Sequence, residues 1–178
     1  MDNKRLKKFF SVKVILIFLL LWIVTNIWMW FGPTGSITLR ELTGENKLPD
    51  TMFFGYSFDT LFNLLKSYGE NGRVIYLGFQ NKDFIYPLIY STLLVGLLLR
   101  SNLPKVMNFW IFAPWVAAIL DYAENLIIRN QVLNFPDLNA EWISVASAFT
   151  VAKWSLVFIS GIFIIIFGSV SFFRKRKS

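Results

Sequence analysis

The chain has 178 residues, of which 55% are hydrophobic and only 16% are charged, and its formal net charge is +7. Soluble domains average about 45–50% apolar and about 25% charged residues, so this composition argues against a soluble or disordered chain. Cysteine and histidine are absent, which excludes disulfides, thiolate catalysis, and metal or haem sites built on these side chains. We therefore expect no metal site and no cofactor.

Four apolar stretches are long enough, or nearly so, to cross a bilayer core, which takes about 20 residues per helix. They cover residues 14–31, 84–99, 109–128 and 142–173. The first follows a basic segment but exceeds a signal-peptide apolar run, so we expect an uncleaved anchor. The sequence predicts an all-α membrane protein: a four-helix transmembrane bundle that forms one integral membrane domain over residues 1–178.

Lysine and arginine are distributed unevenly among the connections. They are concentrated before the first stretch, in the short connection after residue 99, and in the tail at residues 174–177. The other two connections carry more acids than bases. This bias predicts a plasma-membrane protein with both termini in the cytoplasm. Anionic lipid headgroups are the expected partner of the basic tail, and nothing in the pattern indicates a nucleic acid.

The segment of residues 33–83 is the only long connection, and we expect it on the outer side. Its apolar residues recur at helical spacing, Ser57 is a suitable N-cap, and Gly69 is suited to end a helix. A second short helix is expected from Asn71 to Gln80, which gives an outer helical segment over residues 56–82. Such a segment either lies in the membrane interface or caps the bundle, and the sequence leaves both possibilities open.

The third stretch contains polar groups that a lipid-facing helix excludes. Asp121, Glu124 and Asn125 follow the i, i+3, i+4 spacing and share one helix face. The fourth stretch contains Lys153. A charge at the bilayer centre costs at least about 2.5–3.5 kcal/mol, so we expect these groups to pair with one another inside the bundle.

The second stretch adds polar groups near its outer end, and Arg73 of the outer segment is placed to fold over them. The candidate ligand-binding residues are therefore Arg73, Asp83, Tyr86, Tyr90, Asp121, Glu124, Asn125 and Lys153. A simpler interpretation remains open, in which one ion pair only locks two helices together and the tyrosines belong to the membrane interface.

An ordered series of short motifs runs from Leu48 to Trp154. It comprises FGYS at residues 54–57, GENGRVIYL at 69–77, DFIYPLIY at 83–90, AAILDYAEN at 117–125 and KW at 153–154. This series resembles a group of small uncharacterised four-span membrane proteins found widely in bacteria. The resemblance implies a four-helix fold with an outer insertion, and it implies that Tyr76, Pro87 and the candidate residues named above are its characteristic positions. A weaker likeness to sterol isomerases and sigma receptors, which use paired acids inside a four-span bundle, suggests an enzyme as an alternative.

Three functional classes fit these observations. The first is a protein that binds a lipid-like or amphipathic small molecule in the outer half of the bundle. The second is an intramembrane enzyme that uses the paired carboxylates for proton transfer on a lipid or isoprenoid. The third is a transporter or a subunit of a membrane complex, as a homo-oligomer or with a membrane partner.

Overall fold

A computed structural model describes residues 3–45, 47–101 and 103–175, and this part of the chain contains helices and no β-strand. The α-helices are α1 (Asn3–Phe9), α2 (Val12–Trp30), α3 (Ser36–Thr43), α4 (Phe58–Asp83), α5 (Tyr86–Arg100), α6 (Ala113–Leu133) and α7 (Ala140–Lys175). Two short 3-10 helices, η1 (Pro49–Thr51) and η2 (Lys105–Phe112), lie in the connections. Within the described residues, four helical stretches are long and apolar enough to cross a membrane, which confirms the predicted all-α fold.

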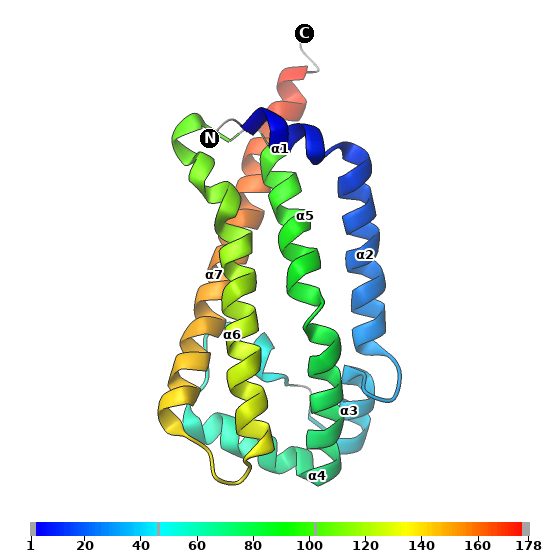
Figure 1. The fold of residues 1–178 in the computed structure, drawn as a ribbon, viewed down its shortest axis with the longest axis vertical. Helices are drawn as coiled ribbons and strands as arrows, with labels where there is room; N and C mark the ends of the chain where they lie inside the picture. Colours follow the sequence, from blue (N-terminus) through cyan, green and yellow to red (C-terminus); the bar gives the residue numbers. More distant parts are fainter. Residues whose placement is uncertain (1–2, 46, 102, 176–178) are drawn as a thin grey trace.

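The long helices form a bundle that is elongated along the helix axes. Figure 1 shows α2, α5, α6 and α7 running along the long axis, with α6 packed between α5 and α7. The end of α7, together with α1 and η2, lies at one end of the bundle, and α3 and α4 lie at the other. These four apolar helices fit a multi-pass membrane protein.

Two polar residues inside α2 satisfy their hydrogen bonds locally. The Thr25 hydroxyl donates to the carbonyl of Leu21, and the Asn26 amide donates to the carbonyl of Trp22, both at 2.7 Å. Such bonds to the preceding turn hide the polar groups without a partner on another helix. The rest of α2 is largely exposed apolar surface, as expected for a helix that contacts lipid.

The helix α4 is bent at the predicted glycine. Ser57 caps its first turn by accepting a hydrogen bond from the Thr60 amide at 3.2 Å. Gly69 has a φ of 62° and a ψ of −174°, which interrupts the helix; a positive φ is open to glycine at little cost. Figure 1 shows the first part of α4 lying across the end of the bundle, and its later part running along the bundle axis toward α5.

Buried apolar side chains form two clusters. One includes Leu61, Leu65, Tyr76, Ile128 and Ile143, and it joins α4 to α6 and α7. The other includes Phe10, Val95, Leu98, Leu99 and Ile111, and it joins α1 and α5 to η2. Along α5 and α6 the polar residues fall between these two clusters. Apolar packing therefore lies on both sides of these polar residues, which we call the middle layer.

Candidate functional site

Lys153 lies between two carboxylates in the middle layer. Its Nζ atom is 2.6 Å from Oδ1 of Asp121 and 2.7 Å from Oε2 of Glu124. All three side chains are buried. Asp121 and Glu124 are three residues apart on α6, so both project toward the face of α7 that carries Lys153. One cation is therefore shared by two acids on the same face of one helix.

The remaining oxygens of these carboxylates also have partners. The Tyr90 hydroxyl on α5 donates to Oδ2 of Asp121 at 3.1 Å. The Thr150 hydroxyl on α7 lies 2.7 Å from Oε1 of Glu124. These bonds tie α5, α6 and α7 together at one level of the bundle, which fixes the positions of the charged groups.

Asp83 and Asn125 form a second polar contact at the junction of α4 and α5. The Asn125 amide donates to Oδ2 of Asp83 at 2.7 Å, and Gln80 donates to the Asn125 backbone carbonyl at 3.3 Å. Asp83 and Asn125 are both buried. Asn125 therefore orients the Asp83 carboxylate from behind and does not itself line the cavity described next.

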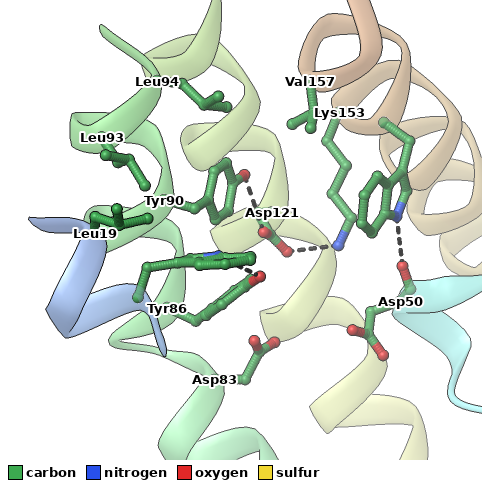
Figure 2. A pocket seen from close by; sticks show the side chains of 12 residues that line it. Leu19, Asp50, Asp83, Tyr86, Tyr90, Leu93, Leu94, Asp121, Lys153 and Val157 are labelled. Atoms are coloured by element: carbon green, nitrogen blue, oxygen red, sulfur yellow. Dashed lines mark hydrogen bonds and ion pairs between the residues drawn. The ribbon is translucent and has the colours of Figure 1, made fainter. Parts of the chain in front are cut away.

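A cavity of about 390 Å³ opens beside these groups. Figure 2 shows that Leu93, Leu94 and Val157 lie toward one end, whereas Asp50 and Asp83 lie toward the other, with Asp121 and Lys153 between them. The cavity is thus apolar at one end and acidic at the other. Its lining comprises Leu19, Trp22, Asp50, Asp83, Tyr86, Tyr90, Leu93, Leu94, Asp121, Lys153, Trp154 and Val157.

Asp50 is the acidic residue of this cavity that the sequence pattern did not reveal. It belongs to η1, in the connection that we expected on the outer side of the membrane. The Trp154 indole donates to the Asp50 carbonyl at 2.7 Å, and Ser147 accepts a hydrogen bond from the Tyr56 amide at 2.8 Å. These bonds hold residues 50–56, which we call the inserted loop, against α7. Irregular backbone is tolerated at this depth where it is buried in protein and lines a cavity.

Arg73 was expected to fold over the site, and the structure places it elsewhere. Its guanidinium donates to the Leu65 carbonyl at 3.1 Å and lies 4.3 Å from the centre of the Phe135 ring. The break at Gly69 leaves carbonyls of the preceding helical turn without helical partners, and Arg73 supplies a donor to one of them. Arg73 therefore stabilises the bend of α4 and contributes nothing to the cavity wall.

Two tryptophans complete the aromatic wall. The Trp22 indole on α2 donates to the Tyr86 hydroxyl at 3.0 Å, which joins α2 to α5 across the cavity. Trp154 is adjacent to Lys153 in the sequence. An apolar helix gives no sequence signal that distinguishes a cavity-lining tryptophan from one at the membrane interface, so neither residue was among the candidates.

No family model matches the chain, and no curated protein and no solved structure matches it either. The function is therefore inferred from the geometry of the cavity and from the chemistry of its lining.

Proposed function

We propose that this membrane protein binds a lipid-like or amphipathic small molecule in the cavity of the middle layer. The observation that supports the proposal is the division of the lining into an apolar end and an acidic end within one hollow. Sites for small molecules commonly have volumes of about 300–1,000 Å³ and a few convergent polar groups on an apolar wall. The cavity has this size and this composition.

An ion pair that only holds helices together would require neither a cavity beside it nor additional acids in the lining of that cavity. Lys153, Asp121 and Glu124 would satisfy one another in a fully packed bundle, yet a cavity lies against Asp121 and Lys153. Asp50 and Asp83 take no part in that pair, yet both border the cavity. The extra acids and the empty volume support a site for a ligand in addition to a structural role.

The proposed setting is the plasma membrane, with both termini in the cytoplasm. The uneven distribution of lysine and arginine supports this orientation. The acidic end of the cavity lies toward α3 and α4, so the polar part of the ligand would lie toward the outer side.

The enzyme alternative is favoured by one observation, the hydrogen bond from Tyr90 to Asp121. Tyr90, Asp121 and Lys153 form a continuous chain of groups that can exchange protons. In such an enzyme the ligand would be a substrate bound in the same cavity. Turnover of the retained molecule, lost in Tyr90→Phe while binding persists, would identify this case.

Retention of a ligand tests the proposal. Protein purified from its membranes in mild detergent is analysed by native mass spectrometry, and we expect one additional mass that lipid extraction identifies. Val157→Phe adds a ring inside the apolar end and should abolish that mass. Ile162→Phe makes the same kind of change on an exposed position of α7 and should leave it unchanged. Equal retention by both variants would refute binding in the cavity.

A further inference from the structure

The acidic groups around the cavity exceed the basic ones. Asp50, Asp83 and Asp121 line it, and Glu124 shares Lys153 with Asp121. Among the described residues, Lys153 is the one basic side chain in the lining, and both ion pairs of this part of the chain use it. Lys153 is thus occupied by Asp121 and Glu124. Within the described part of the chain, neither Asp50 nor Asp83 forms an ion pair.

Asp50 also has an unused acceptor. Its Oδ1 atom is buried and has no hydrogen-bond partner among the described residues. A buried acceptor without a donor is costly, because it has lost its bonds to water and has gained none in return. Asp83, by contrast, accepts one hydrogen bond, which a neutral amide supplies. A donor or a positive charge placed in the cavity would complete the environment of Asp50.

The aromatic lining favours a particular kind of cation. Trp22, Tyr86, Tyr90 and Trp154 surround the volume between the acids and the apolar end, and the Tyr86 and Tyr90 ring centres are 5.4 Å apart. Aromatic faces attract ammonium groups within about 6 Å, and several rings together form a cage for substituted ammonium ions. A metal ion needs several oxygens converging at short distance. Within the described part of the chain no group of three acidic side chains is arranged to hold one.

We propose that the ligand of this cavity is a cationic amphiphile, with an organic ammonium head between Asp50 and Asp83 and an alkyl tail against Leu93, Leu94 and Val157. This inference rests on the proposed ligand-binding function and specifies its chemical class. The head meets the two carboxylates that Lys153 leaves unpaired. The tail occupies the end of the hollow that has no polar side chain.

A series of three probes tests the charge of the head. Purified protein in a neutral detergent is titrated with a long-chain alkyltrimethylammonium, and with the alkyl alcohol and the alkyl sulfate of the same chain length. We expect the ammonium to bind about tenfold more tightly than the alcohol, and the sulfate to bind more weakly than both. This ranking is measured on the wild-type chain, so it does not depend on the folding of any variant. Equal affinity for the sulfate and the ammonium would overturn the inference.

Isosteric variants locate the interaction. Asp50→Asn and Asp83→Asn should each weaken the ammonium about tenfold and leave the alcohol unchanged. Asp137→Asn, which neutralises an exposed acid in the connection between α6 and α7, should behave as wild type. Unchanged ammonium affinity in both cavity variants would overturn the inference.

The same titrations separate this inference from the proposal on which it rests. Equal binding of alcohol and ammonium that Val157→Phe abolishes would overturn the cationic ligand and leave ligand binding in the cavity standing. Unchanged binding of all three probes by Val157→Phe would instead refute both.

Discussion

Lys153 determines whether two acids can remain buried at the same level of the bundle. Its ammonium group is the charge partner of both Asp121 and Glu124, at 2.6 and 2.7 Å. Removing one member of a buried ion pair leaves an uncompensated charge, which costs about 3–5 kcal/mol. Lys153→Met should therefore destabilise the protein by about this amount, measured by reversible unfolding of the purified protein in mixed micelles.

The matched control removes the charges together. A triple variant, Lys153→Met with Asp121→Asn and Glu124→Gln, has no buried charge at this level, so it should be clearly more stable than Lys153→Met alone. If the single variant is as stable as wild type, Lys153 is not held between the two carboxylates as the structure shows.

Asp50 is an acid whose ionisation is shifted by its surroundings. Burial raises the pKa of the Asp50 carboxyl above its ordinary value, while the charge of Lys153 acts to lower that pKa and the charge of Asp121 to raise it further. Asp83 and Glu124 are further acids whose charges interact with that of Asp50. The net direction is upward, so Asp50 takes up a proton at a higher pH than an exposed aspartate does.

This shift predicts the pH dependence of cation binding. A protonated Asp50 offers no charge to an ammonium head, so the affinity for an alkyltrimethylammonium should rise with pH and level off above the pKa of Asp50. Below that pKa it should fall by about tenfold in total, the loss expected for Asp50→Asn, because the protonated carboxyl offers no charge to the head. The probe carries a fixed charge, so titration of the ligand does not contribute. Asp50→Asn should remove this component of the profile, and identical profiles for the variant and wild type would contradict the role of Asp50.

At the scale of elements, the inserted loop depends on a glycine. Gly55 has a φ of 84°, and a Cβ atom added there would lie 2.7 Å from Oγ of Ser147, the group that accepts the Tyr56 amide. Gly55→Ala should therefore displace the loop, and Asp50 with it, and weaken the binding of the alkyltrimethylammonium. The left-handed backbone alone costs about 1–2 kcal/mol with a side chain.

Gly44 provides the matched control for this substitution. It also has a positive φ, 72°, but a Cβ atom there would meet nothing within 4 Å. Gly44→Ala should have a similar backbone cost and leave binding unchanged. Equal effects of the two substitutions on binding would show that the contact with Ser147 does not position the cavity.

The membrane-crossing elements were predictable because each depends on a local pattern. The stretch of residues 14–31 corresponds to α2 (Val12–Trp30), and the capping of α4 by Ser57 and its break at Gly69 follow from residue type. The stretch of residues 109–128 lies within the third candidate span, Lys105–Leu133, in which η2 runs directly into α6.

The path of the inserted loop and the position of Arg73 were not predictable in the same way. Two bonds to α7, from the Tyr56 amide and from the Trp154 indole, fix the loop, and each joins residues far apart in the sequence. No periodic pattern records such contacts. Arg73 belongs to a helix whose direction changes at Gly69. The sequence separation between Arg73 and Asp83 therefore does not indicate where the Arg73 side chain lies.

At the scale of the whole molecule, the arrangement of the ends predicts the topology in the membrane. Lys7 in α1 and Lys105 in η2 are exposed at one end, whereas Glu41 in α3 and Asp137 after α6 are exposed at the other. The natural chain has no cysteine, so single cysteines can be placed at these positions. A membrane-impermeant maleimide should label Glu41→Cys and Asp137→Cys in intact cells, and Lys7→Cys and Lys105→Cys only after lysis. The reverse pattern would contradict cytoplasmic termini.

The whole fold also places the cavity beside α2, a helix that is mostly exposed. The helix α2 is mostly exposed, yet it supplies Leu19 and Trp22 to the lining. The two apolar clusters hold the remaining helices together above and below the cavity. An amphiphile from the bilayer would therefore need to displace only α2, whose indole bond to Tyr86 is its polar link to the cavity wall.

The most direct measurement is a crystal structure of the protein purified from its own membranes and grown in a lipidic mesophase. We predict elongated electron density in the cavity, with its polar end against Asp50 and Asp83 and its remainder along Leu93 and Val157. A cavity that is closed by side chains, or one that contains only separate water molecules, would contradict a ligand-binding site.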